Sequence, residues 1–157
     1  MSEEKTTNII LFSGDYDKAM AAYIIANGAA AYDHKVTIFH TFWGLNALRK
    51  DEPIKANKSL MEKCLAKCLV DQRRGVIKDA ICGCSPKLIK NVMKKHNAMP
   101  LADLIDLAEE QDINLVACTM TLDLLGLQKE ELRESSQYAG VAAYLADAED
   151  GNVNLFI

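Results

Sequence analysis

The segment NIILFSGDYDKAMAAYIIANGAAAYDHKVTIFHTF, residues 8–42, decides the fold because it predicts a strand, a helix and a second strand in succession. Residues 8–12 are a short apolar run that ends in a Ser-Gly-Asp turn, which is typical of a strand followed by a helix N-cap. Residues 16–30 are rich in alanine and predict the helix. Residues 35–42 are β-branched and aromatic and predict the second strand. A strand, helix and strand at this spacing favour a right-handed βαβ unit with parallel strands.

The rest of the chain continues this alternation of strands and helices. Residues 43–48 predict a short helix or turn. Further helices are predicted at residues 86–95, from Pro100, from about 121, at 129–135 and at 140–148. Further strands are predicted at 113–117 and 152–157. Residues 50–74 are polar with a helical pattern, and residues 75–85 give no clear pattern. We therefore expect a single domain over residues 1–157. Its architecture is a three-layer α/β/α sandwich around a mostly parallel sheet, with an excursion at about residues 50–85.

Composition limits the classes of function. Half of the 157 residues are hydrophobic and a quarter are charged, which indicates a globular chain with a substantial core. The net charge of −4 argues against nucleic acid as a partner, because phosphate binding needs a basic surface. The longest apolar stretch, residues 19–32, is too short to span a bilayer, so we expect no integral membrane segment.

The cysteines and the first residues indicate the compartment. The chain contains five cysteines, and its polar first seven residues do not resemble a secretory signal. An odd number of cysteines without a signal favours free thiols in a reducing compartment. We therefore expect a cytoplasmic protein.

Cys118 lies at the end of the third predicted strand, within ACTMTLDLLG, residues 117–126. In mostly parallel α/β sheets, ligands and reactive groups collect at the carboxyl ends of the strands. A helical pattern follows, and the free N–H groups at a helix N-terminus stabilise a thiolate, the form that attacks or carries sulfur. Cys118 is therefore a candidate reactive cysteine. The alternative is a small buried hydrophobic residue, since free cysteines are among the most buried residue types.

The other cysteines form weaker patterns. Cys82 and Cys84 could form a redox or metal-binding pair, but their CxC spacing is not the CxxC of zinc or thioredoxin-like sites. Cys64 and Cys68 lie four residues apart on a predicted helix, which favours packing over ligation. The spacing of these thiols alone therefore does not decide their role.

The sequence gives no pattern for a metal or a cofactor. The three histidines are dispersed: His34, His40 and His96. His40 lies near the end of the second strand, where a core or surface position is favoured over a role in a site. The sequence contains neither GxGxxG nor a P-loop. We therefore expect neither a bound metal nor a cofactor.

Five segments resemble the DsrE-like (DsrE/DsrF/DsrH) superfamily. They are IILFSGDYDKAMAAYIIANGAAA (9–31), KVTIFHTFWGLNALRKD (35–51), ACTMTLDLLGL (117–127), GVAAYLADA (140–148) and NVNLFI (152–157). The HTFWGLNALRK block and the C-x-M-[ST]-x-D-x-x-G block are specific, and the similarity extends over nearly the whole chain. It is a similarity to the branch often labelled peroxiredoxins or DsrE-type sulfurtransferases.

The resemblance implies a Rossmann-like sandwich that forms oligomers and acts as a sulfur carrier or sulfurtransferase. The cysteine of the motif falls on Cys118, with Asp123 and Gly126 matching the rest of the block. Such a protein holds sulfur as a persulfide or thiosulfonate and relays it to a partner thiol. The implied donor is rhodanese-like and the acceptor TusA-like, and whether the chain turns over alone stays open. The candidate accessory residues of a site at Cys118 are Asn46, Cys82, Cys84, Thr119, Thr121 and Asp123.

One region departs from the family pattern and keeps two alternatives open. Many members of this branch have a Met-rich middle segment, whereas this chain has GVIKDAICGCSPKLIKNVMKKH, residues 75–96. One alternative is a thiol redox protein that uses Cys82, Cys84 and Cys118. The other is a non-catalytic oligomeric interaction or small-ligand-binding module with a structural Cys118. A peroxidase is disfavoured because a peroxide-reducing cysteine needs an arginine and a hydroxyl group beside it. The arginine nearest to Cys118 in sequence is Arg133, which lies outside the motif.

Overall fold

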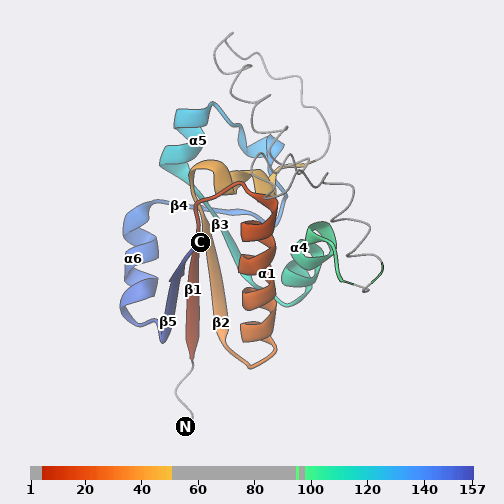
Figure 1. Ribbon diagram of the computed structural model, residues 1–157. Helices are drawn as coiled ribbons and strands as arrows, with labels where there is room; N and C mark the ends of the chain where they lie inside the picture. Colours follow the sequence, from red (N-terminus) through yellow and green to blue (C-terminus); the bar gives the residue numbers. More distant parts are fainter. Residues whose placement is uncertain (1–4, 51–94, 96–97) are drawn as a thin grey trace, which may run out of the picture.

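The computed structural model describes residues 5–50, 95 and 98–157 (Figure 1). Its strands are β1 (Thr6–Leu11), β2 (Lys35–His40), β3 (Asn114–Cys118), β4 (Gln137–Ala139) and β5 (Val153–Phe156). Its helices are α1 (Tyr16–Ala30), α4 (Leu101–Glu110), α5 (Thr119–Leu125) and α6 (Val141–Glu149), with 3₁₀ helices η1 (Phe42–Leu48) and η2 (Lys129–Glu131). The strands form one sheet in the order β4-β3-β2-β1-β5, and every neighbouring pair is parallel.

Helices cover both faces of the sheet, which confirms the predicted three-layer α/β architecture. Figure 1 shows α1 and α4 on one side of the strands and α6 on the other. The predicted βαβ unit is β1, α1 and β2, and β1 pairs with β2 in register from Thr6 with Lys35 to Leu11 with His40. All the strands end at the edge of the sheet near η1 and α5.

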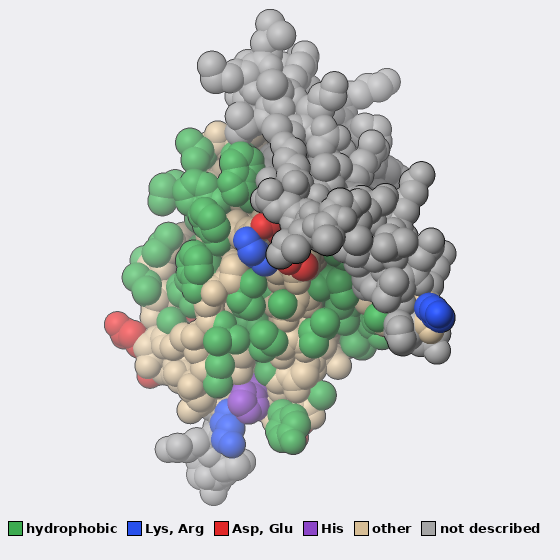
Figure 2. Space-filling view, in the orientation of Figure 1, with side chains coloured by type: hydrophobic (Ala, Val, Ile, Leu, Met, Phe, Trp, Pro, Cys, Tyr) green, Lys and Arg blue, Asp and Glu red, His purple; other side chains and the backbone are tan. Residues whose placement is uncertain are grey.

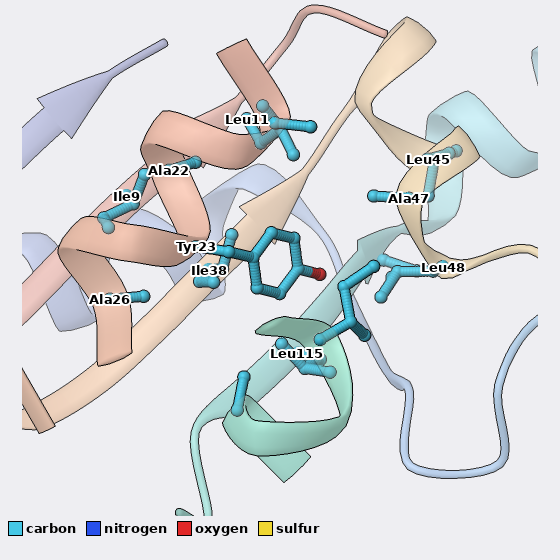
Figure 3. Packing of buried hydrophobic residues seen from close by; sticks show 14 of the residues in the cluster. Ile9, Leu11, Ala22, Tyr23, Ala26, Ile38, Leu45, Ala47, Leu48 and Leu115 are labelled. Atoms are coloured by element: carbon cyan, nitrogen blue, oxygen red, sulfur yellow. The ribbon is translucent and has the colours of Figure 1, made fainter. Parts of the chain in front are cut away.

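The main core lies between the sheet and the α1 and α4 layer. It includes Ile9 of β1, Ile38 of β2 and Leu115 of β3, which pack against alanines of α1 and against Tyr23 (Figure 3). The small alanine side chains let α1 approach the strands closely. In α4 the buried residues Leu104, Ile105 and Ala108 recur at helical spacing, so that helix turns one apolar face to the core.

A second, smaller cluster lies on the α6 face. Its buried members are Phe39, Val116, Cys118 and Tyr144. Successive residues of a strand point to opposite faces of a sheet. For this reason Leu115 and Ala117 join the main core, whereas Val116 and Cys118 face α6.

The structure corrects several predicted elements. The helix predicted at residues 129–135 is only the single turn η2, and the short strand β4, residues 137–139, was not predicted. The second strand ends at His40 rather than residue 42, because Thr41 and Phe42 turn into η1. The excursion predicted at about residues 50–85 and most of the helix predicted at 86–95 lie outside the described residues.

Candidate functional site

The ends of β1, β2 and β5 are held together by the residues that follow them. The amide of Phe12 donates a 2.8 Å hydrogen bond to the carbonyl oxygen of Ile157, and the amide of Gly44 donates a 2.9 Å bond to that of Phe12. Gly44 lies so close to β1 that a Cβ atom there would clash with the carbonyl oxygen of Leu11. These contacts fix η1 across the carboxyl edge of the sheet.

A threonine pair joins the end of β2 to α5. The hydroxyl oxygens of Thr41 and Thr121 lie 3.0 Å apart, and the amide of Phe42 donates a 3.4 Å bond to the Thr121 hydroxyl. Phe42 has φ of 46°, a left-handed conformation that is rare for a bulky residue. Thr121 therefore stabilises an unusual backbone turn, and in this position it serves the architecture of the edge.

Three phenyl rings form an exposed aromatic row beside this turn. The ring of Phe12 lies 5.3 Å from that of Phe42 and 5.9 Å from that of Phe156, measured between centroids. All three side chains are exposed. Further exposed apolar residues lie on α5, where they are Met120 and Leu124, and on α6, where they are Val141 and Leu145. Figure 2 shows hydrophobic side chains gathered over the part of the molecule where Figure 1 places α5 and α6.

Cys118 is the last residue of β3 and directly precedes α5, as the sequence predicted for the strand end. It is a free cysteine with only 2% of its surface exposed. Its side chain lies in the cluster under α6 with Phe39, Val116 and Tyr144. Cys118 thus lies at the carboxyl edge of the sheet, but its side chain is buried on the face that α6 covers.

A buried polar pair lies on the opposite face of the same strands. The hydroxyl of Tyr23 and Nε2 of His40 are 2.9 Å apart, and Nδ1 of His40 is 3.1 Å from the carbonyl oxygen of Val116. A carbonyl oxygen only accepts, so Nδ1 carries the proton and Nε2 accepts from Tyr23. Burial lowers the pKa of His40 to about 4 and raises that of Tyr23. His40 is therefore a neutral core residue, the position that the sequence favoured for it.

The accessory candidates do not gather around the thiol. Asn46 is buried in η1, where it lines a hollow of about 20 Å³ with Ala19 of α1 and Leu101 of α4, on the face opposite α6. Asp123 is exposed on α5, and Thr119 is half-buried. Cys82 and Cys84 lie outside the described residues, so their pairing with Cys118 stays a prediction.

Tyr144 is the member of the Cys118 cluster that sequence reasoning missed. It is the one aromatic residue in VAAYLADAE, and the only buried residue of α6. Its ring packs 5.1 Å from that of Phe39. The single large ring in a helix of small and polar residues indicates that Tyr144 is the residue by which the helix packs on the sheet. The sequence of the helix does not indicate which strand the ring packs against.

In the described part of the chain, no group of three or more His, Cys, Asp or Glu side chains is arranged to hold a metal ion. None of the helices described there has both the length and the apolar character that are needed to cross a bilayer.

The parallel sheet, the two helical layers and a cysteine at the end of β3 define a Rossmann-like α/β protein with a thiol at its ligand edge. A sequence model of the DsrE/DsrF/DrsH-like family matches residues 3–156, and the chain belongs to this family. The predicted family is therefore confirmed.

Two relatives match along the full length. The chain is 64% identical over 160 residues to YrkE of Bacillus subtilis, an uncharacterized protein, with all of both chains covered. It is 29% identical over 158 residues to the sulfur carrier protein DsrE2 of Allochromatium vinosum, with 99% of each chain covered. The second of these names gives a sulfur-carrier function to a distant relative.

Solved structures confirm the fold. The YchN protein of E. coli superposes with a TM-score of 0.62 at 7% sequence identity, over 98% of this chain and 99% of that one. The protein MTH1491 of Methanobacterium thermoautotrophicum, whose function is unknown, gives a TM-score of 0.56 at 12% identity, over 98% and 100%.

Proposed function

We propose that this chain is a sulfur carrier or sulfurtransferase that holds sulfur on Cys118. The observation that carries the proposal is the position of this thiol at the end of β3, directly before α5, within the block that resembles the family motif. In parallel α/β sheets this edge is where ligands bind. The full-length similarity to a protein named as a sulfur carrier supports the same function.

The proposed transfer is a pair of thiol exchanges. The Cys118 thiolate attacks the outer sulfur of a donor persulfide, the sulfur–sulfur bond of the donor breaks, and the donor thiolate leaves with the electron pair. With thiosulfate as donor, sulfite is the leaving group. Cys118 then carries a persulfide, whose outer sulfur is attacked by an acceptor thiolate, and the Cys118 thiolate is regenerated. No electrons are gained or lost overall, whereas a Cys118 thiosulfonate would require a two-electron oxidant.

Transfer requires a donor and an acceptor, and we propose a rhodanese-like protein and a TusA-like protein in these roles, in the cytoplasm. We also propose that the chain forms a homo-oligomer. The exposed apolar residues of α5 and α6 support an assembly, because apolar side chains grouped on a surface favour contact with another protein. The net charge of −4 is consistent with protein partners rather than nucleic acid.

Intact mass after incubation with thiosulfate, and separately with a persulfide-loaded rhodanese, tests the proposal. We expect a gain of one sulfur atom that reductant reverses in the unchanged protein and that is absent from Cys118→Ala. The control is a chain that keeps Cys118 and has serine at Cys64, Cys68, Cys82 and Cys84, and it should still gain the sulfur. A sulfur adduct that persists in Cys118→Ala would assign the carrier role to another thiol.

The burial of Cys118 favours a second candidate function, a non-catalytic interaction or small-ligand-binding module. In that case the thiol is a packing residue, as its contacts with Phe39, Val116 and Tyr144 allow. Such a protein takes up no sulfur from either donor, and Cys118→Ala changes stability alone. The same mass measurement therefore separates the two functions.

A further inference from the structure

The side chains that bury Cys118 come from both the sheet and a helix. Phe39 and Val116 belong to adjacent strands of the sheet, and the buried side chain that α6 adds to the cluster is Tyr144. With 2% of its surface exposed, the thiol cannot be reached by a second sulfur atom while its cover is in place. A donor or acceptor thiolate must approach in line with the bond that breaks, so some part of this cover has to move before transfer.

The helix α6 is attached to the sheet unevenly. Seven of its nine residues are exposed, Ala148 is half-buried, and Tyr144 alone is buried. The three residues before Tyr144 are all exposed, and two apolar side chains of the helix, Val141 and Leu145, face solvent. Among the side chains in the first half of α6, Tyr144 alone is therefore packed into the sheet.

The polar ties of α6 lie at its other end. Nδ2 of Asn8 donates a 3.1 Å hydrogen bond to the carbonyl oxygen of Asp147. Nδ2 of Asn154 donates a 3.0 Å bond to the carbonyl oxygen of Ala148, and the hydroxyl of Thr6 donates a 3.1 Å bond to that of Asp150. These bonds join the last turn to β1 and β5, and at the other end the helix follows β4 after the single residue Gly140.

We infer that α6 is a gate over Cys118, with Tyr144 as the side chain that closes it. Opening lifts the turn of α6 that carries Tyr144, between β4 and the tethered last turn, away from the sheet and exposes the thiol at the end of β3. The inference rests on the proposed function, because a carrier thiol has to meet its partners. Local opening of a weakly packed element costs less free energy than global unfolding, so the thiol is reached without loss of the fold.

The gate also explains how a loaded sulfur would be kept. A persulfide is exposed to attack by any thiol in solution, and a closed cover restricts exchange to a partner that displaces α6. The exposed side chains Val141 and Leu145 lie on the outer surface of the gate, where a protein that binds them could shift the helix. Exchange is then limited by opening rather than by collision with small thiols.

Alkylation kinetics test the gate without any sulfur donor. The parent for this measurement has serine in place of Cys64, Cys68, Cys82 and Cys84, so that Cys118 is the single thiol. We expect folded parent to react with a small alkylating reagent, iodoacetamide, about 100-fold or more slowly than the same chain unfolded in urea. Tyr144→Ala should react at least about 10-fold faster than the parent, since its cover is lost. Tyr144→Phe keeps the ring and should stay within about 3-fold of the parent, as should the exposed-site control Leu145→Ala.

The urea dependence of the rate keeps the test decisive if Tyr144→Ala fails to fold. In the parent, reaction through α6 opening exposes little surface and changes only slightly with low urea, whereas reaction through global unfolding follows the full equilibrium slope. A parent that reacts as fast as the unfolded chain, or only with the global slope, overturns the gate. Equal rates for parent and folded Tyr144→Ala overturn it too.

The two proposals fail separately. Slow, Tyr144-dependent alkylation with no sulfur adduct from either donor would leave a gated thiol and remove the carrier function. A sulfur adduct on Cys118 with alkylation rates that do not depend on Tyr144 would leave the carrier and remove the gate.

Discussion

The hydroxyl of Tyr23 lies 2.9 Å from Nε2 of His40, and both side chains are completely buried between α1 and the sheet. The other ring nitrogen of His40 binds the carbonyl oxygen of Val116, two residues before Cys118. The pair thus links helix α1, strand β2 and strand β3 beneath the edge that carries the thiol. Figure 3 shows the Tyr23 side chain extending from α1 into the main core.

Stability should fall as pH falls below about 6.5 because of His40. Burial lowers its pKa from 6.5 to about 4 in the folded chain, so over this interval the unfolded chain binds a proton that the folded chain does not. The contribution is complete above pH 6.5 and is lost as pH approaches 4, with a slope of about 1.4 kcal/mol per pH unit. Urea unfolding at several pH values measures the slope. His40→Gln should reduce it, and His34→Gln, which leaves the buried ring in place, should not.

Removing the Tyr23 hydroxyl should destabilise the fold. In Tyr23→Phe the acceptor Nε2 of His40 remains buried without its donor, and an unsatisfied buried group costs about 1–3 kcal/mol. Chemical denaturation gives the change in unfolding free energy. The matched control is Tyr32→Phe, at a side chain that is 83% exposed, which should change stability by less than about 0.5 kcal/mol. Equal stabilities for the two variants would contradict the role of the hydrogen bond.

Two glycine-to-alanine substitutions should have opposite effects. At Gly44 a Cβ atom would lie 2.7 Å from the backbone carbonyl carbon of Leu11, and neither backbone can yield easily, so Gly44→Ala should cost about 3 kcal/mol. At Gly28, inside α1, no atom of the described residues outside its own stretch of helix lies within 4 Å of the added Cβ, so Gly28→Ala should stabilise by up to about 1 kcal/mol. Thermal or urea unfolding of both variants measures the difference, and a neutral Gly44→Ala would show that η1 does not pack against β1 in this way.

The Thr41–Thr121 contact should hold the turn at the end of β2. Thr121→Val keeps the volume but removes the hydroxyl that binds Thr41 and the amide of Phe42, which should cost about 1–2 kcal/mol. Thr119→Val, two residues earlier, should cost less than about 0.5 kcal/mol. Sulfur loading of Cys118, measured by mass in both variants, should persist wherever the protein is folded, because Thr121 supports the edge rather than the thiol.

Local sequence signals predicted most of the sheet correctly. Local patterns of a few residues predict β1 from its apolar run, α1 from its alanines and β2 from its β-branched residues. A βαβ unit also has one favoured handedness. The strand β4 was missed because three residues are too short to show alternation. The prediction of a helix at residues 129–135 was wrong. Only residues 129–131 form a helical turn, because the chain then has to extend toward the edge strand β4, which begins at Gln137.

The sequence alone determined that Cys118 ends a strand and directly precedes a helix, since both follow from the local pattern of apolar and polar residues. Only the tertiary structure decided which face of the sheet receives its side chain. In β3 a shift of one residue would exchange Ala117 and Cys118 between the two layers, and the pairing of β3 with β2 fixes that choice. Tyr144, 26 positions further along the chain, joins the cluster of the thiol because α6 lies on that face. Such a contact depends on how distant elements pack, which no local pattern encodes.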